Sequence, residues 1–350
     1  MSIFQNFSNH RPWGNVPGPS SDVVLSSRIR LARNVVDIPF PARANKETQR
    51  QLIDQVLSVS KDVVTLTPHE FVDLTSIKKI ERQFLMERHL ISPEMVGEDK
   101  ERGVLLAQDH YITIMLNEED HLRLQSFEPG LALESAWLRA NAVDNALGEK
   151  LLYAFDSEWG YCTSCPTNAG TGLRASCLLH LPSLVMHQSI ERIFEELANA
   201  GVTARGFYGE RSKAVGDLFQ LSNSTSLGQT EEDFIRNVER VVHTVARYER
   251  QSREDLLNEK NRTNTEDDVY RSWGILLHAR SISYDEAMQL LSRVRLGQQL
   301  GFEVPVRADT LEELMIATQP AHVQLTKGSP LRAEERDRFR ATLIREKLKG

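Results

Sequence analysis

The pattern of apolar residues changes near residue 250, and this change limits what the chain can fold into. Before it, short β-prone segments alternate with amphipathic helical segments; after it, every periodic segment is helical. The pattern predicts a mixed α+β unit followed by a small all-helical one. The polar, charged stretch 251–265 predicts a linker between them. The predicted units are therefore 20–250 and 266–350.

Within the first unit, alternation and helical spacing predict individual elements. Strands are expected at 22–25, 104–107 and 111–116, with shorter strand-like pieces around 178–181 and 206–221. Helices are expected at 46–61 and 189–200, and Leu133, Trp137, Ala140 and Leu147 recur as the core face of another. Three pairs have the spacing of helix N-caps, namely Thr230 with Asp233, Ser283 with Glu286, and Thr310 with Glu313. The last of these helices must stop near Pro320.

Composition excludes several classes of protein. The 350 residues carry a net charge of −7, which disfavours generic nucleic-acid binding. No apolar run approaches the roughly 20 residues of a membrane-spanning helix, and residues 1–21 do not resemble a signal peptide. Three cysteines predict free thiols, because this number does not make a disulfide framework. We therefore expect a cytoplasmic protein with no membrane contact.

Generic nucleotide-binding motifs do not explain the chain. Residues 170–175 match G-x-G-x-x-A, but Cys165-Pro166-Thr167-Asn168 precedes them and cannot be the buried strand that a dinucleotide fold needs. The pair Cys162 and Cys165 lacks the further ligands of a zinc site, so no metal-binding residues are predicted. Neither a P-loop nor the protein-kinase motifs are present.

Five segments, in order, resemble the phosphagen kinases, which move phosphate between ATP and a guanidino group. They lie at 24–30, 87–92, 117–123, 165–176 and 205–210. The resemblance implies a catalytic unit with a mainly antiparallel sheet flanked by helices. It also implies ATP as phosphate donor and Mg²⁺ bound chiefly through ATP phosphates and water.

The resemblance also implies which residues bind the nucleotide. A phosphoryl transfer needs positioning and neutralisation of three phosphates, which arginine performs well. The expected ATP-binding residues are Ser26, Ser27, Arg28, Arg30, His89, Arg123, Arg174, Ala175, Ser176, Arg205 and Gly206.

The acceptor poses a second problem, because a guanidinium is a poor nucleophile until it loses a proton. By resemblance, Glu119 pairs with the guanidino group and deprotonates it, while Glu210 is a second carboxylate on the opposite side. Cys165 matches the family's reactive cysteine, with a buried, inert thiol as the alternative. Glu118 and Asp120 either flank the site or act through water near Mg²⁺.

Two departures from the family favour a protein substrate. Only about twenty residues precede the first block, where small-molecule kinases carry a helical domain that closes over the substrate. A helical region follows the catalytic unit instead, as in the bacterial members that phosphorylate arginine in proteins. There, Arg336, Asp337 and Arg340 match R-D-x-x-R-A, which by resemblance forms an allosteric phosphoarginine pocket; the alternative is a solvated charged helix.

Further expectations concern partners and rival functions. The apolar faces of the helical unit predict a homodimer. By resemblance, we expect a role in stress response, a link to a Clp ATPase or protease, and regulation by an activator protein. Two alternatives stay open: a kinase for free arginine or another small guanidine, and a catalytically silent phosphoarginine-binding adaptor.

Overall fold

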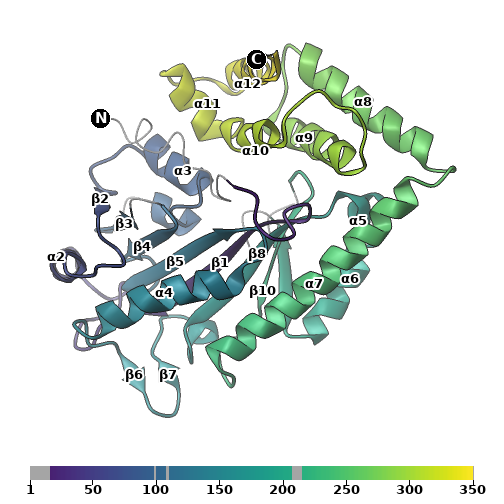
Figure 1. The fold of residues 1–350 in the computed structure, drawn as a ribbon. Helices are drawn as coiled ribbons and strands as arrows, with labels where there is room; N and C mark the ends of the chain where they lie inside the picture. Colours follow the sequence, from purple (N-terminus) through teal and green to yellow (C-terminus); the bar gives the residue numbers. More distant parts are fainter. Residues whose placement is uncertain (1–15, 98–99, 108–109, 207–214, 350) are drawn as a thin grey trace.

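One large antiparallel sheet organises the protein (Figure 1). The structure is a computed structural model and describes residues 16–97, 100–107, 110–206 and 215–349. In this part of the chain, eight strands pair in the order β2-β3-β4-β5-β1-β8-β10-β9, each antiparallel to its neighbours. They are β1 Val24–Arg33, β2 His69–Asp73, β3 Gly103–Ala107, β4 Ile112–Leu116, β5 Leu122–Pro129, β8 Leu173–His180, β9 Val202–Gly206 and β10 Leu218–Asn223. A separate hairpin joins β6 Phe155–Asp156 to β7 Gly160–Tyr161.

Helices cover one face of this sheet. Figure 1 shows α4 (Leu133–Gly148), α7 (Glu231–Leu256) and α6 (Ile190–Asn199) lying against it, and α2 (Lys46–Ser60) packs on the same apolar core. The opposite face is covered at the β2 to β4 edge by α3 (Lys79–Glu87) and the short helix Pro93–Val96. A short helix, α5 (Pro182–Met186), follows β8.

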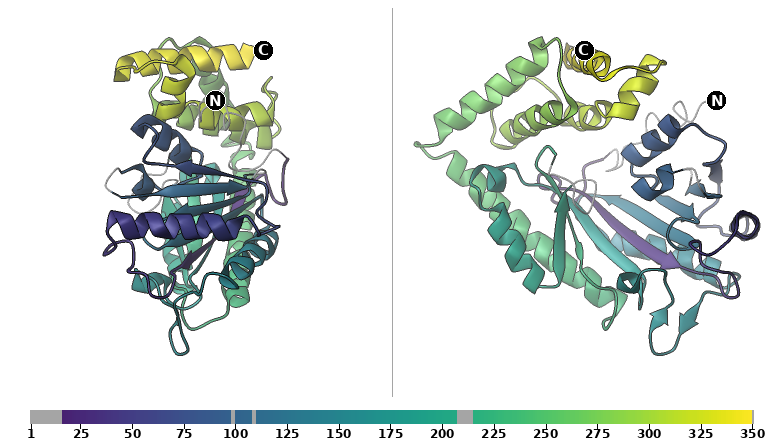
Figure 2. Two further views of the ribbon diagram at one scale, coloured as in Figure 1. Left: turned by 90° about the vertical axis from the view of Figure 1, so that its left-hand side faces the viewer. Right: turned by 180° about the vertical axis from the view of Figure 1, so that it is seen from behind.

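Strand alternation gives the sheet two different faces. On β1, Ile29 and Leu31 are buried in the core under the helices. Arg28 and Arg30 must then point to the other face, because successive side chains in a strand alternate. Figure 2, right, looks onto that other face. The alternation of side chains along β1 thus places apolar residues in the core on one face of the sheet and charged residues on the other face.

The C-terminal helices form a second core. They are α8 Arg262–His278, α9 Tyr284–Gln299, α10 Ala308–Ala317, α11 Pro320–Lys327 and α12 Ala333–Lys349. Leu276, Leu291, Leu314 and Ile344 pack together there, and sheet residues such as Leu218 join them. The helical unit therefore packs against one end of the sheet (Figures 1 and 2). Within the described ranges, no helix is both long enough and apolar enough to cross a membrane.

The predicted fold class is confirmed, together with several of its elements. The helix expected at 46–61 is α2, the one at 189–200 is α6, and the stripe from Leu133 to Leu147 is the buried side of α4. At α7, Thr230 accepts a hydrogen bond from the backbone N–H of Asp233 at 3.2 Å, as an N-cap should.

Some predicted strand limits are wrong. The strand expected at 22–25 is β1, which runs to Arg33, because its arginines alternate with buried apolar residues. The piece expected at 178–181 is the end of β8, which begins at Leu173. The piece expected at 206–221 is two strands: β9 ends at Gly206 and β10 begins at Leu218, and 207–214 lie outside the described residues.

Much of the stretch predicted to be a linker at 251–265 is helical. Helix α7 continues to Leu256 and α8 begins at Arg262. Its polar residues are used in packing: Arg253 donates to Glu249 at 3.0 Å, and both side chains are buried. The cap expected at Thr310 is also wrong, because the N-cap of α10 is Arg307, three residues earlier, although the helix does end before Pro320.

Candidate active site

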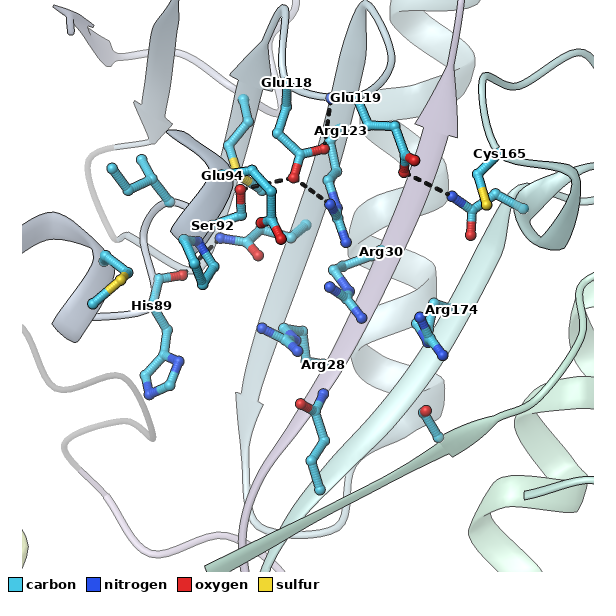
Figure 3. Close-up of a pocket in the computed structure, with 18 of the residues that line it drawn as sticks. Arg28, Arg30, His89, Ser92, Glu94, Glu118, Glu119, Arg123, Cys165 and Arg174 are labelled. Carbon is cyan, nitrogen blue, oxygen red and sulfur yellow. Dashed lines mark hydrogen bonds and ion pairs between the residues drawn. The ribbon is translucent and has the colours of Figure 1, made fainter. Parts of the chain in front are cut away.

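A cavity of about 650 Å³ opens on the face of the sheet that α4 and α7 leave uncovered. Strands β1, β5, β8 and β10 form its floor, and the segment that follows α3 forms one wall. Figure 3 shows its side chains standing in front of the strands, with helices behind. The cavity therefore brings together residues that lie about two hundred positions apart in the chain.

Four arginines form a cationic cluster on the floor of this cavity: Arg28, Arg30, Arg123 and Arg174 (Figure 3). Arg30 lies directly across from Arg174 in the β1–β8 register. Burial, together with the nearby charges of Arg123 and Arg174, lowers the pKa of Arg28 to about 9. Burial and the other three arginines also hold the pKa of Arg30 well below its ordinary value. The cluster is thus electrostatically strained and suited to a polyanion.

Arg30 supports a phosphate site in a second way. Its Nε is buried and has no hydrogen-bond partner among the described residues. A buried donor without an acceptor costs free energy, and a phosphate oxygen would supply the acceptor. The residues present therefore fit the triphosphate of ATP.

Glu118 counterbalances one side of the cluster. Its carboxylate accepts hydrogen bonds from Arg123, from Ser92 Oγ at 2.7 Å and from the backbone N–H of Glu119 at 2.9 Å. Burial opposes its ionisation, but Arg123 and these hydrogen bonds outweigh burial and lower the pKa of Glu118 to about 2. Glu118 is therefore a fixed anion that orients Arg123.

This carboxylate predicts an acid-sensitive fold. A glutamate in the unfolded chain titrates near pH 4.3, so Glu118 contributes its full stability above that pH and loses it as pH falls toward about 2. The contribution is about 3 kcal/mol. We expect the unfolding free energy of Glu118→Gln to depend less on pH between about 4.5 and 2.5 than that of the wild type, in urea titrations at each pH. Equal pH dependence in the two proteins would show that Glu118 is not the group concerned.

Glu119 lies at the exposed mouth of the same cavity. Its Oε2 is 3.5 Å from Asn168 Nδ2, the one side-chain hydrogen bond that Glu119 makes with the described part of the chain. Partial burial, followed by the charges of Asp120 and Glu118, raises the pKa of Glu119. A carboxylate with a raised pKa and open access suits a general base.

Asp120 and Ser164 fix the loop of Glu119 to the loop of Cys165. Buried Asp120 accepts from Asn34 Nδ2 at 2.7 Å and from the backbone N–H of Ser164 at 2.6 Å. Ser164 Oγ donates to the carbonyl of Glu119 at 2.8 Å. Glu118 and Asp120 thus each hold a neighbouring group in place: Arg123 in the case of Glu118, and Ser164 in the case of Asp120.

Cys165 lines the cavity on the side of Glu119 (Figure 3). Its Sγ is 3.0 Å from Thr167 Oγ1, and all three cysteines of the chain are free thiols, as expected. Cys165 is half-buried and reaches the cavity, whereas Cys177 is buried in the core.

Other predicted nucleotide residues divide between the two faces of the sheet. His89 and Arg205 line the cavity, and burial followed by the charge of Arg28 lowers the pKa of His89 to about 3. The side chains of Ser27 and Ala175 point to the helix-covered face: Ser27 Oγ donates to the carbonyl of Gly130 at 2.8 Å, and Ala175 packs in the core. Their side chains therefore do not reach the cavity, and their assignment as ATP-binding residues stays a prediction.

The remaining predicted residues have different surroundings. Ser26, Ser176 and Gly206 are buried and are not among the residues that line the cavity, and Ser176 Oγ donates to the carbonyl of Arg28 at 3.3 Å. Glu210 lies outside the described residues. Sequence reasoning missed several residues of the cavity wall and floor, which are Glu94, Lys100, Arg102, Gln125, Asn168, Gln220 and Ser222. Gln220 and Ser222 are two residues apart on a strand, and this spacing could have indicated that their side chains share one face of the sheet.

The predicted phosphoarginine pocket lies on α12. Arg340 is buried, and it donates to the carbonyls of Thr318 at 2.7 Å and Ile282 at 2.9 Å and to Asp337 at 2.5 Å. Arg336 donates to the carbonyl of Leu331 at 3.1 Å. The three residues thus share one side of the helix, but Arg340 is engaged by the fold rather than solvated.

Comparison with known proteins agrees with this geometry. Residues 51–252 match the family described as ATP:guanido phosphotransferase, C-terminal catalytic domain. The solved structure of lombricine kinase has the same fold, with a TM-score of 0.59 and 22% identity over 71% of this chain and 75% of that one. The structure of a duplicated taurocyamine kinase from Schistosoma mansoni has a TM-score of 0.59 and 23% sequence identity, over 81% of this chain and 43% of that one. The chain belongs to the ATP:guanido phosphotransferase family.

Within that family, the chain groups with the protein-arginine kinases. Residues 262–350 match the domain described as protein-arginine kinase McsB C-terminal domain. A relative from Halothermothrix orenii named protein-arginine kinase is 45% identical over 96% of each chain. Another of that name from Halalkalibacterium halodurans is 47% identical over 97% of this chain and 95% of its own.

Proposed function

We propose that this protein transfers the γ-phosphoryl group of ATP to the guanidino group of arginine residues in proteins. The observation that carries the proposal is that exposed Glu119 and the half-buried arginine cluster share one cavity. Glu119 is suited to accept a proton from a cationic acceptor, and the arginine cluster is suited to hold a triphosphate. The relatives named protein-arginine kinase support the same acceptor.

The chemistry follows from these positions. The acceptor guanidinium binds against Glu119, which takes a proton from the attacking nitrogen. That nitrogen forms a bond to the γ-phosphorus while the bond to the β–γ bridging oxygen breaks, and ADP carries away the electron pair. Arg28, Arg30, Arg123 and Arg174 stabilise the negative charge on the phosphates. Mg²⁺, which the family implies, would enter with ATP and neutralise phosphate charge, bound chiefly by phosphate oxygens and water.

A protein acceptor is favoured over free arginine by two observations. Glu119 lies at the exposed mouth of the cavity, where an arginine projecting from a polypeptide can reach it. The C-terminal residues match a domain of protein-arginine kinases over their whole length. A small-guanidine kinase remains the second candidate, because the fold neighbours are kinases named for small guanidines. A silent adaptor is disfavoured, since binding alone does not need a base and a triphosphate cluster together.

The test is transfer of labelled phosphate from ATP, with Mg²⁺, to casein and to free L-arginine in parallel. We expect acid-labile label on arginine of the protein, because Glu119 is accessible from outside. Label on free arginine alone would favour the small-guanidine kinase. Absence of label from both, in the presence of a candidate activator, would favour the adaptor.

We also propose that Arg336, Asp337 and Arg340 bind phosphoarginine and regulate the kinase. The carboxylate of Asp337 is partly exposed and can meet a guanidinium, while Arg336 supplies a cation one turn from Arg340. Since Arg340 is held by Thr318 and Ile282, binding there would act on the packing of the helical unit. Binding of a phosphoarginine analogue, equal in wild type and Asp337→Ala, would contradict this assignment.

The proposal extends to the cellular setting that the family resemblance implies. We propose a cytoplasmic homodimer that acts in stress response, marks proteins for a Clp ATPase or protease and responds to an activator protein. The helical unit supports the dimer, because its small core is formed by five helices of the described chain and a few sheet residues such as Leu218. A solution mass equal to one chain would contradict the dimer.

A further inference from the structure

The cavity wall that carries His89 begins with a strained residue. Helix α3 ends in a Schellman arrangement, in which the N–H of His89 donates to Met86 at 2.8 Å and that of Leu90 donates to Leu85 at 3.0 Å. His89 has φ of 58°, a left-handed conformation that glycine usually occupies at this position. A residue with a side chain stays there only when its surroundings hold it. The wall therefore depends on contacts outside the cavity.

Glu87, two residues before His89, makes such a contact with the C-terminal helical unit. Its buried carboxylate accepts from the backbone N–H groups of Ala321 at 2.7 Å and His322 at 3.0 Å, and lies 2.7 Å from Nδ1 of His322. These N–H groups belong to the first turn of α11, which has no intrahelical acceptors for them. Glu87 of the catalytic unit thus caps a helix of the other unit.

Apolar packing continues the same junction. The ring of His322 packs against that of Phe84 of α3 in a tilted arrangement, with ring centroids 4.6 Å apart. Ala321 joins the core that contains Leu90 and Ile91, two residues of the cavity wall itself. Burial lowers the pKa of Arg88 to about 10, and the carboxylates of Glu313 and Glu87 oppose that effect. The charge of Glu313 on α10 is therefore close enough to act on Arg88. Both residues immediately before His89 therefore face the helical unit.

The sheet holds the other side of this segment. Gln125 of β5 donates from Nε2 to the carbonyl of His89 at 2.8 Å and lines the cavity itself. The segment from Glu87 to His89 is consequently held between the catalytic sheet and α11. Release of α11 would remove one of these two supports.

We propose that Glu87 is a positioning residue for nucleotide binding: by capping α11, it keeps the His89–Ser92 wall in the conformation that faces the cavity. Docking of the helical unit then sets the affinity for nucleotide without touching the acceptor carboxylate Glu119. Arg340 contacts the same junction, because it donates to the carbonyl of Thr318, three residues before Ala321. The inference rests on the proposed function only in assigning the cavity to a nucleotide.

The experiment compares full-length wild type, Glu87→Gln and His322→Asn. Binding of MgADP is measured by calorimetry, KM for ATP and kcat by label transfer, and amide exchange across 88–92 by mass spectrometry. We expect both variants to bind MgADP about tenfold more weakly, with KM for ATP raised equally and kcat changed less than about twofold. Exchange at 88–92 should become faster, while exchange in β1 stays the same.

Arg250→Gln is the matched control. It removes two side-chain hydrogen bonds to Asp22, at 2.9 and 2.7 Å, away from the cavity wall. It should lower stability without changing MgADP affinity or exchange at 88–92. If Glu87→Gln and His322→Asn behave like this control, Glu87 is a structural contact only and the inference is wrong. If wild type fails to bind MgADP, the proposed function is wrong, and the exchange at 88–92 alone decides whether Glu87 holds the wall.

Discussion

Glu119→Gln should lower kcat for arginine phosphorylation by about 100- to 10,000-fold, the range for loss of a general base. The amide keeps the size of the side chain and its contact with Asn168, but it cannot take a proton. Because Glu119 is exposed and its side chain is in no ion pair of the described residues, the fold should be unaffected. Rapid-quench single turnovers, with melting temperature measured alongside, check both statements.

The pH profile gives an independent check on Glu119. The wild-type rate should fall as pH drops through the raised pKa of Glu119, because protonation removes the base. This acidic limb should begin above the ordinary range of a glutamate and be absent from Glu119→Gln. The control is Glu196→Gln on α6, where the carboxylate is exposed and 3.8 Å from Arg192. A Glu119→Gln rate within threefold of wild type would rule out the base assignment.

Arg30→Met is expected to change activity and stability in opposite directions. Removing one donor from a transition-state anion site typically lowers the rate about 100- to 1,000-fold. In the absence of nucleotide, however, the methionine removes a charge that lies directly across from Arg174 and near Arg28, and it keeps most of the side-chain stem. The unfolding free energy should rise by about 0.5–1 kcal/mol.

Label-transfer kinetics and urea denaturation without nucleotide measure the two effects of Arg30→Met. The matched control is Arg192→Met, since Arg192 is exposed on α6 and 3.8 Å from Glu196. It should change neither quantity by much. A destabilised Arg30→Met protein would mean that Arg30 is paired inside the fold, contrary to the electrostatic strain inferred for the cluster.

The sequence predicted which residues meet at the site better than it predicted how they are held. Arg28, Arg30, Arg123, Arg174, Glu119 and Cys165 line one cavity, as the five segments implied. The same segments did not reveal that the side chains of Ser27 and Ala175 lie on the core side, because a matched motif does not say which face of a strand each residue occupies. Alternation with Arg28 on β1 and with Arg174 on β8 could have assigned both side chains to the core side.

The fold shows a similar division. Helices with strong apolar periodicity, such as α2 and α4, were predicted closely. The end of α7 was predicted as linker because its residues are charged, and only the tertiary structure shows that Arg253 is buried against Glu249 and the N-terminal segment at Asp22. The cap that Glu87 places on α11 joins residues 234 and 235 positions apart, so no local pattern contains it.

The two-faced sheet separates two kinds of evolutionary constraint at neighbouring positions. On β1, Arg28 and Arg30 are constrained by binding of the ligand, whereas Ile29 and Leu31 are constrained by packing in the core beneath α4 and α7. A saturation scan that scored protein abundance and phosphotransfer separately would therefore show a two-residue rhythm along β1, β5 and β8. Substitutions at every second residue of these strands could therefore change which phosphate donor or acceptor the enzyme prefers. The residues between them would keep the fold unchanged.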